Sequence, residues 1–423
     1  MKNSEYLQKV KQFIPSGSQT FSKNPEQYVL GVSPVAISKA KGAYVWDVED
    51  RKFLDTVMAL GPMILGYADE RIDRVVKEQI DKGTIFSLPS DLEVQLAEKL
   101  SKVIPCAEMS RFLLNGGDAT TGAVRLARYV TKKDHIAKCG YHGWQDWSIA
   151  NKEGRNGGVP EDVKKLTHDF KYNDLDSLEE ILNNFEVAAV IMEPANDVAP
   201  QEGYLEKVKK LANEKGAILI FDEMITGFRW SLGGAQEYFG VTPDLACFGK
   251  AISNGYPLSA ICGKREIMEK MSEVFVSGTF GGDNLGLIAA LETIRIMEED
   301  QEFHERLHAK GEKLINDSNK VFQKYSLPLE FVGFGPHPTL KIKISDDLES
   351  RILKTYLYQE FNKRAILFIT AIMISDAHTI ENIDEIVRTF EELGAGLQGI
   401  SDFKELEDRL EGEIIKPRGV RFS

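Results

Sequence analysis

The chain has 423 residues, which is more than a single hydrophobic core usually fills, so we expect two or more domains. A hydrophobic content of 43% and a charged content of 28% are ordinary for a soluble globular protein. The net charge of -13 argues against a nucleic-acid surface, and no apolar stretch approaches the roughly 20 residues of a membrane-spanning helix.

The cysteines and the N-terminus indicate the compartment. The four cysteines are widely spaced and form no CxxC pair, which argues against a disulfide framework or a zinc ribbon. They are Cys106, Cys139, Cys247 and Cys262. Residues 1–6 lack the apolar core of a signal peptide. We therefore expect reduced thiols in a cytoplasmic protein.

The predicted elements begin after an N-terminal stretch of 40 residues, whose prolines and glycines predict irregular structure. From residue 111 to about 285, short apolar runs alternate with helical patterns. Strands are predicted at 111–114, 135–139, 187–192, 217–221, 245–249 and 258–262, and helices at about 119–131 and 205–215. Such alternation predicts a mostly parallel α/β sheet.

The pattern turns helical from residue 285, where Leu287, Leu291 and Ile294 recur at helical spacing. The last 120 or so residues mix helices with a strand near 340–344. The basic run at 416–421 is expected to be a surface extension rather than a site.

Asp222 and Lys250 are the most informative pair in the chain. Each closes a short apolar run that is typical of a buried parallel strand, and ligands bind outside the carboxyl ends of such strands. Pyridoxal 5'-phosphate (PLP) needs both groups. Its aldehyde forms a Schiff base with a lysine amine, and a carboxylate keeps its ring nitrogen protonated. The plainer alternative is an ordinary charged residue at the end of each strand.

Other predicted strand ends carry groups that suit the same cofactor. Gly116 and Gly117 lie between a strand and a helix, where backbone N–H groups bind phosphate. Tyr141, followed by His142, could stack on a pyridine ring. The alternatives are a plain turn and an aromatic residue at the rim.

Two further segments could face the same crevice. Glu193 and Asn196 follow the apolar run at 187–192. Thr279 lies in a glycine-rich segment before the helix at 285, and its hydroxyl could donate a hydrogen bond to a phosphate. A flexible hairpin tip is the alternative for Thr279.

Seven stretches in a fixed order carry a family resemblance: 41–47, 61–66, 125–128, 141–143, 222–229, 248–251 and 278–280. With them the chain resembles the class III aminotransferases, PLP enzymes of fold type I. Within this family it is most similar to glutamate-1-semialdehyde 2,1-aminomutase and its aminotransferase relatives. The resemblance implies an α/β fold with a mostly parallel central sheet, helices on both faces and a smaller α+β domain.

The resemblance also implies roles for individual residues. Lys250 would be the Schiff-base lysine, Asp222 the partner of the pyridine nitrogen, and Tyr141 the stacking residue. Gly116 and Gly117 would offer backbone donors to the phosphate. Thr279 would reach the phosphate of a neighbouring subunit, which implies a homodimer with shared active sites. We expect three parts: an N-terminal segment (1–60) packing with the small domain, a large PLP-binding domain (61–295) and a C-terminal small domain (296–423).

The chain departs from the family pattern at two informative positions. Gly117 stands where the family usually has a hydroxyl residue. Lys23 stands where the aminomutases carry an arginine for the substrate carboxylate, and lysine lacks the bidentate fork that suits a carboxylate. The segment 281–284 after Thr279 also departs from the Ser-Gly-Asn-Pro type run that is typical there. These changes resemble a branch often found with surface-polysaccharide genes. The expected function is therefore transfer of an amino group from an amino-acid donor to a carbonyl acceptor, with a sugar or polysaccharide precursor as one candidate acceptor. Aminomutase activity is the alternative.

Two readings from other classes remain open. His304, Glu305 and His308 match the HExxH pattern of zinc proteases, but their charged surroundings and the lack of a clear third ligand favour a solvated helix without metal. A non-catalytic binding protein that kept the fold is the other, and the intact Asp222 and Lys250 argue against it.

Overall fold

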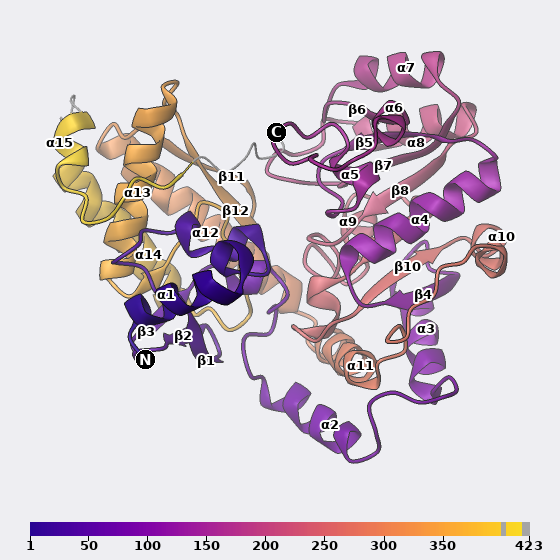
Figure 1. Ribbon diagram of the computed structural model, residues 1–423, viewed down its shortest axis with the longest axis horizontal. Coiled ribbons are helices and arrows are strands. Elements are labelled where there is room, and N and C mark those ends of the chain that lie inside the picture. Colours follow the sequence, from indigo (N-terminus) through magenta and orange to yellow (C-terminus); the bar gives the residue numbers. More distant parts are fainter. Residues whose placement is uncertain (399–402, 417–423) are drawn as a thin grey trace. The chain divides into compact units, whose positions relative to one another are not determined.

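The structure, a computed structural model, describes residues 1–398 and 403–416. Most of the basic run near the C-terminus lies outside the described residues. The chain divides into two compact units (Figure 1). The first contains Met1–Asp69 together with the C-terminal part from Glu305, and the second is the continuous segment Glu70–His304. The three-part division expected from the sequence stays a prediction.

The first unit begins with a helix, so the prediction of an irregular N-terminus is wrong for Asn3–Phe13, which forms α1. Glu5 accepts a hydrogen bond from the Lys2 backbone N–H at the start of this helix. The helix ends at Ile14, whose extended backbone is what a residue before proline prefers. The buried Asn3 side chain donates to Asp47 (2.9 Å), which fixes the helix on the strands that follow.

The strands of this unit join the two ends of the chain. The strands β1 (Ile37–Lys41), β2 (Tyr44–Asp47), β3 (Lys52–Asp55) and β13 (Ile366–Leu367) form a four-stranded sheet in that order. The β3–β13 pair is parallel, with Leu54 opposite Ile366. A second sheet is the hairpin of β11 (Leu329–Phe334) and β12 (His337–Ile342). The predicted strand near 340–344 corresponds to β12.

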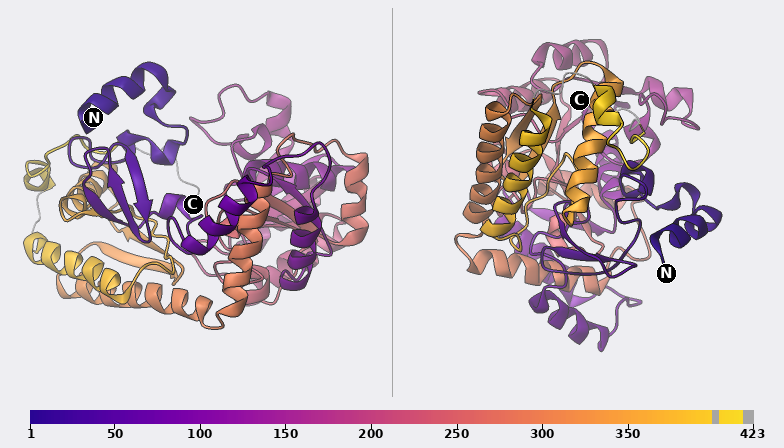
Figure 2. Two further views of the ribbon diagram at one scale, coloured as in Figure 1. Left: turned by 90° about the horizontal axis from the view of Figure 1, so that it is seen from below. Right: turned by 90° about the vertical axis from the view of Figure 1, so that its left-hand side faces the viewer.

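Three long helices and one short one complete the first unit, in the order α12 (Phe303–Lys324), α13 (Asp347–Lys363), α14 (Ile380–Leu397) and the short α15 (Phe403–Glu407). α12 and α14 lie side by side (Figure 2), joined by an ion pair between Lys313 and Asp384 (2.8 Å) and a hydrogen bond from Tyr325 to Glu391 (2.9 Å). The smaller α+β domain expected from the sequence is confirmed. None of the helices formed by the described residues combines the length and apolar character needed to cross a bilayer.

Phe390 on α14 is the centre of this unit's aromatic core. Four rings surround it at centroid distances of 4.8 to 5.8 Å: Phe322, Phe331, Phe361 and Phe368. Phe390 itself is fully buried. We expect Phe390→Ala to lower the free energy of unfolding by about 3–5 kcal/mol, because it leaves a cavity among rings that cannot close over it.

Urea unfolding followed by circular dichroism measures this loss. The matched control is Phe13→Ala, since Phe13 is 80% exposed in the same unit and its loss should change stability by less than about 0.5 kcal/mol. Equal effects of the two changes would contradict the assignment of Phe390 to the core.

The second unit is built on a seven-stranded sheet. Its order is β4 (Met109–Leu113), β10 (Ser259–Gly263), β9 (Leu245–Phe248), β8 (Ile218–Asp222), β7 (Val187–Met192), β5 (His135–Cys139) and β6 (Thr167–Asp169). From β9 to β6 all neighbours are parallel, and β10 is antiparallel to both of its neighbours. The predicted mostly parallel sheet is confirmed.

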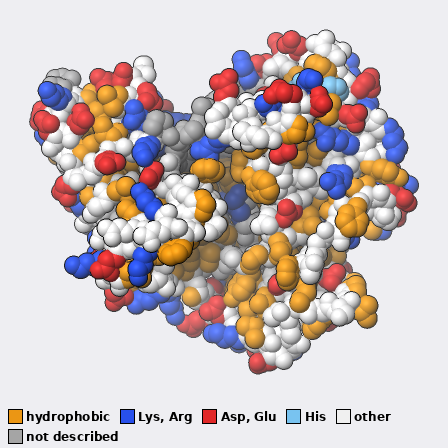
Figure 3. Space-filling model, viewed as in Figure 1, with side chains coloured by type: hydrophobic (Ala, Val, Ile, Leu, Met, Phe, Trp, Pro, Cys, Tyr) orange, Lys and Arg blue, Asp and Glu red, His pale blue; other side chains and the backbone are white. Residues whose placement is uncertain are grey.

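Helices and short turns connect these strands. They are α2 (Glu70–Ile80), α3 (Asp91–Val103), α4 (Gly116–Thr131), α5 (Asp146–Ile149), α6 (Glu161–Lys165), α7 (Leu175–Asn184), α8 (Tyr204–Glu214), α9 (Ala235–Tyr238), α10 (Arg265–Met268) and α11 (Asn284–Glu299). α11 packs against α2 and α3. Figure 3 shows hydrophobic side chains on the surface around α2 and α11. Ile85, Phe86 and Leu88, in the segment between α2 and α3, are exposed.

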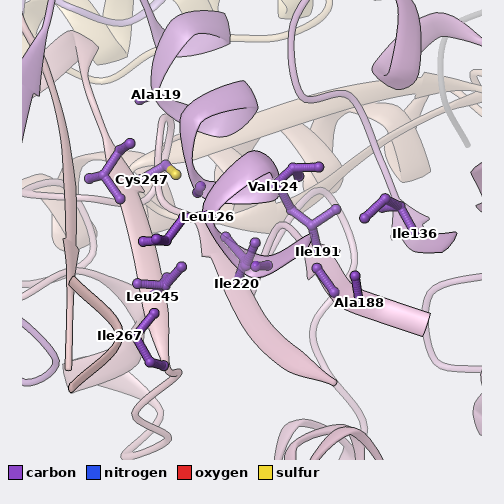
Figure 4. Close-up of a cluster of buried hydrophobic side chains, with 14 of the residues drawn as sticks. Ala119, Val124, Leu126, Ile136, Ala188, Ile191, Ile220, Leu245, Cys247 and Ile267 are labelled. Carbon is purple, nitrogen blue, oxygen red and sulfur yellow. The ribbon is translucent and has the colours of Figure 1, made fainter. Parts of the chain in front are cut away.

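The core between α4 and the sheet sets the position of that helix. Ala119, Ala123 and Ala127 recur every four residues and are fully buried, so α4 approaches the strands closely. Leu126 packs with Ile220 and Leu245 in the same cluster (Figure 4). Close packing here places the N-terminus of α4 at the edge of the sheet where β8 and β9 end.

Candidate active site

Asp222 and Lys250 stand at the same edge of the sheet. Asp222 is the last residue of β8, opposite Cys247 of the parallel strand β9. β9 ends at Phe248, and after Gly249 a short 3-10 turn begins with Lys250. All residues of β9 are buried, and β8 is buried from its second residue onward. The two functional side chains therefore appear where each buried strand gives way to a loop.

Asp222 is held by two donors. Its Oδ2 lies 2.8 Å from His142 Nδ1, and its Oδ1 accepts from the backbone N–H of Met224 at 3.0 Å. The other ring nitrogen of His142 lies 3.1 Å from the carbonyl oxygen of Cys139. Asp222 and His142 are each only 2% exposed. The carboxylate is thus fixed in one orientation, and its remaining lone pairs are available to a ligand.

Met224 joins three of the loops at this edge. A Cβ at Gly116, the first residue of α4, would lie 2.7 Å from Met224 Sδ. A Cβ at Gly249, just before Lys250, would also lie 2.7 Å from that sulfur. A side chain at either position would therefore displace Met224, and the ends of β4, β8 and β9 converge on the Met224 side chain.

The N-terminus of α4 forms the floor of the same region. Gly116 and Gly117 open this 16-residue helix, so their backbone N–H groups have no acceptor within it. The helix dipole adds positive potential at this end. Thr120 of the same turn donates to the carbonyl oxygen of His142 (2.5 Å), which fixes α4 to the loop after β5. The arrangement suits an anion such as a phosphate.

The Lys250 amine is shifted toward its neutral form. Burial lowers the pKa of Lys250, while the negative charges of Asp222 and Glu193 act in the opposite direction and the charge of Arg229 adds to the lowering. A lowered pKa makes the amine a better nucleophile near neutral pH. Lys250 also holds a left-handed backbone conformation (φ 48°), which is uncommon for a residue with a side chain and is found at functional sites.

Glu193 follows β7 and lies next to Gly140 and His142. A Cβ at Gly140 would sit 3.6 Å from Glu193 Cδ and 3.7 Å from His142 Cε1. Burial, and then the charge of Asp222, raise the pKa of Glu193, although the Lys250 charge opposes this. The edge therefore holds two carboxyl groups in different environments beside one amine.

The Glu193 carboxyl predicts a pH-dependent stability. Its pKa rises on folding from 4.5 to about 8, so the folded protein binds more protons than the unfolded chain between these values. Stability from this group is present at low pH and is lost as pH rises through that window. For Glu193→Gln without cofactor, we expect the melting temperature relative to wild type to increase from pH 5 to pH 8.

Thermal melts across this range measure the difference. The exposed Glu202 gives the matched control, since Glu202→Gln should leave the pH profile unchanged. A profile for Glu193→Gln that runs parallel to wild type would mean that Glu193 does not titrate in this window.

The remaining sequence-predicted residues have different surroundings. Tyr141 lies at the end of β5 and is 45% exposed. Asn196 accepts a hydrogen bond from Val198 N–H (2.8 Å), so its side chain shapes a local turn. Thr279 is exposed in the loop before α11. Lys23 belongs to the first unit, where it is exposed at the end of a 3-10 turn, and is not in the unit that holds the other residues.

Sequence reasoning missed three residues at this edge. Met224 and Arg229 lie in the segment whose resemblance to the family was noted, but nothing in their spacing indicated a role. Arg229 is 1% exposed, and burial lowers its pKa to about 10. Gln145 caps α5, and its side chain lies against Gly117. No sequence pattern indicates this contact because it joins two loops.

The HExxH pattern does not assemble a metal centre. His304 uses Nε2 to bond the carbonyl oxygen of Phe228 (3.1 Å). Within residues 1–398 and 403–416, no three His, Cys, Asp or Glu side chains are grouped so that they could hold a metal ion.

The site fits PLP on structural grounds. A phosphate matches the free N–H groups of α4, a pyridine nitrogen matches the oriented carboxylate of Asp222, and an aldehyde matches the amine of Lys250. One buried atom at the α4 terminus, Gln145 Oε1, has no hydrogen-bond partner in the protein. Buried polar atoms are rarely left unpaired, which indicates that a ligand belongs beside it.

Comparison with known proteins identifies the family. The model of the class-III aminotransferases matches residues 28–390. A 3-aminobutyryl-CoA aminotransferase from Cloacimonas acidaminovorans is 40% identical over 364 residues, 84% of this chain and 86% of that protein. A glutamate-1-semialdehyde 2,1-aminomutase from Methanococcus vannielii is 37% identical over 343 residues, 74% of this chain and 80% of that protein.

A solved structure of a PLP-containing protein has the same fold as this chain. The FumI protein of Sphingopyxis sp. MTA144, in its PLP internal aldimine form, matches 98% of both chains with a TM-score of 0.87 and 25% identity. The family and the cofactor expected from the sequence are thereby confirmed. This chain belongs to the class-III aminotransferase family and is a PLP-dependent aminotransferase or aminomutase.

Proposed function

We propose that the protein is an aminotransferase that moves an amino group from an amino-acid donor to a separate carbonyl acceptor, with Lys250 and Asp222 as its catalytic residues. The observation that carries the proposal is the adjacent ends of β8 and β9, where a carboxylate fixed by His142 stands beside an amine shifted toward its neutral form.

The two residues have complementary tasks. Bound PLP supplies an electron sink for negative charge at the substrate carbon. Asp222 holds the proton at the pyridine nitrogen, and His142 and the Met224 N–H keep its carboxylate oriented. Lys250 would hold the cofactor through its amine, and the same amine, when free, would carry the proton that is removed from the substrate carbon. Positioned proton transfer of this kind contributes about 10²–10⁴-fold to the rate.

Other residues hold the cofactor in this proposal. The N–H groups of Gly116 and Gly117 bind the phosphate, and Tyr141 stacks on the ring. Glu193 contributes a carboxyl group beside His142 and Lys250. These assignments rest on the convergence of the loops around Met224 and Gly140.

Transfer between two substrates is favoured over an internal shift by two facts. The relative from Cloacimonas acidaminovorans, whose name gives it aminotransferase activity, is 40% identical over most of both chains. Lys23 also stands in place of the arginine that the aminomutases are expected to use. The 37% identity to an aminomutase keeps mutase activity as the second candidate. A sugar acceptor has no support among these relatives. We therefore propose an acceptor that is the carbonyl counterpart of an amino acid, such as an oxoacid.

A homodimer with shared active sites is part of the proposal. The loop that carries Thr279 is exposed, and Phe275 and Phe280 beside it are 84% and 54% exposed. Such apolar surface is unusual on a monomer and suits a second copy of the chain. A cytoplasmic location is proposed because all four cysteines are free and buried.

The visible absorption of the purified protein tests the reaction. The band of the bound cofactor should bleach on addition of L-glutamate, with release of one 2-oxoacid per site, and return on addition of a carbonyl acceptor. A 3-amino acid should be tried as donor in parallel, since the donor class is open. A band that no donor bleaches, together with conversion of glutamate-1-semialdehyde, would overturn the proposal in favour of the mutase.

A further inference from the structure

Gln145 lies where the side chain of residue 117 would otherwise be. A Cβ added to Gly117 would lie 2.6 Å from Gln145 Nε2 and 2.8 Å from Cδ, with Oε1 nearer still. A Cβ at Gly143 would meet the same oxygen at 2.5 Å. The carboxamide therefore fills the space between the two glycines, at the N-terminus of α4.

Gly117 is a glycine for lack of space and not for its backbone. Its φ angle is outside the left-handed region, so a residue with a side chain could adopt its conformation. The carboxamide of Gln145 occupies the space of a side chain here, so residue 117 can carry one only if Gln145 moves. Positions 117 and 145 are therefore coupled, because residue 117 has no side chain and the carboxamide of Gln145 occupies that space.

The carboxamide oxygen of Gln145 has no hydrogen-bond partner in the protein. Gln145 Oε1 is buried and accepts no hydrogen bond. As the N-cap of α5, Gln145 does not use its side chain to cap that helix. An unpaired buried amide costs stability unless something bonds to it. The backbone N–H groups that open α4 also have no acceptor within the helix, and such groups attract an anion.

We propose that Gln145 is a ligand of the PLP phosphate, donating a hydrogen bond from its Nε2 group beside the N–H groups of Gly116 and Gly117. This rests on the proposed position of the phosphate at the N-terminus of α4. An amide presents two N–H donors and carries no charge, so it can turn its N–H toward the anion. A half-turn of the carboxamide exchanges Oε1 and Nε2, so an N–H donor then stands where the unpaired oxygen lies. The phosphate gains a side-chain donor, and the buried position no longer holds an unpaired acceptor.

The test measures PLP binding to the full-length protein after its cofactor has been removed. The quenching of tryptophan fluorescence on addition of PLP gives the Kd. Gln145→Ala should raise the Kd for PLP about 10- to 100-fold, the range for a hydrogen bond to a charged group. The Kd for pyridoxal, which has no phosphate, should not change. Gln95→Ala is the matched control, because Gln95 is an exposed glutamine on α3 of the same unit.

A double substitution tests the coupling. Gly117→Ser alone should weaken PLP binding, since its side chain collides with Gln145. Gly117→Ser combined with Gln145→Ala should regain much of the lost affinity, because a hydroxyl then has both the space and the position of the missing donor. Phosphorus NMR of bound PLP should shift in Gln145→Ala and move back toward wild type in the double variant.

Two results would overturn the assignment. One is a Gln145→Ala variant that binds PLP as tightly as wild type. The other is an equal loss for PLP and pyridoxal, which would make Gln145 a residue that shapes the loop. Melting temperatures of the cofactor-free variants identify any variant that fails to fold. If Gln145→Ala fails, Gln145→Glu takes its place, because it has the same shape but no N–H donor. Gln145→Glu should bind PLP even more weakly than Gln145→Ala. None of these readouts uses an amino donor, so they remain informative if the proposed transfer reaction is wrong.

Discussion

Lys250→Ala is expected to abolish turnover, with a loss of at least about 10²–10⁴-fold, the contribution of a positioned proton-transfer group. The larger part of the loss should fall on kcat, because the amine acts on the substrate carbon and not only on binding. Treatment of the wild-type protein with borohydride, followed by peptide mass spectrometry, should place the cofactor on the peptide containing Lys250. The variant should carry no covalently bound cofactor.

A matched lysine separates this effect from a general loss of charge. Lys264 pairs with Asp244 in the same unit and lies outside the proposed machinery. Lys264→Ala should retain turnover. Adding a small primary amine to Lys250→Ala should restore part of the rate, since the missing base is then supplied in solution. Full activity of Lys250→Ala in a preparation free of wild type would remove the lysine from the mechanism.

Asp222→Asn is expected to lower kcat by about 10²–10³-fold, the usual effect of removing one preorganised electrostatic group. Asparagine keeps the shape and can still accept a hydrogen bond, but it has no charge to hold a proton on the pyridine nitrogen. The variant should fold, since the bond to the Met224 N–H can be kept. Steady-state kinetics and the pH dependence of the cofactor band measure the change.

The pair formed with His142 offers a second check. Because His142 bonds Asp222 directly, the effects of Asp222→Asn and His142→Ala on kcat should be far from additive. Asp176→Asn on the exposed surface of α7 is the control and should leave kcat unchanged. Additive losses, or an unchanged kcat in Asp222→Asn, would speak against a carboxylate acting on the ring.

Much of the second unit could be predicted from the sequence because its information is local. The run Val187–Met192 is apolar throughout, and it forms a strand buried on both faces within the same bounds. Asp222 and Lys250 were found because each ends such a run. A parallel sheet brings the carboxyl ends of its strands to one edge, so the position of the two residues follows from the pattern alone.

What the sequence did not predict depends on distant contacts. The helix Asn3–Phe13 was missed because the many prolines and glycines that follow it obscured a short helical segment. β13 has only two residues, and its pairing with β3 joins positions more than 300 residues apart. Gln145 lacks any motif, and its importance arises only when the loop after β5 folds against Gly117.

The arrangement of the two units along the chain has a consequence for synthesis. The second unit is continuous, so every residue proposed to hold the cofactor phosphate has left the ribosome before the C-terminal helices are made. The N-terminal segment has no such independence, because β3 can pair with β13 only after Leu367 has emerged. Until then β3 is an unpaired strand edge, open to association with other chains. The first unit contains the N-terminus but is the last to be completed during synthesis. If the ribosome stalls after the second unit, the edge of β3 stays unpaired and needs protection by a chaperone.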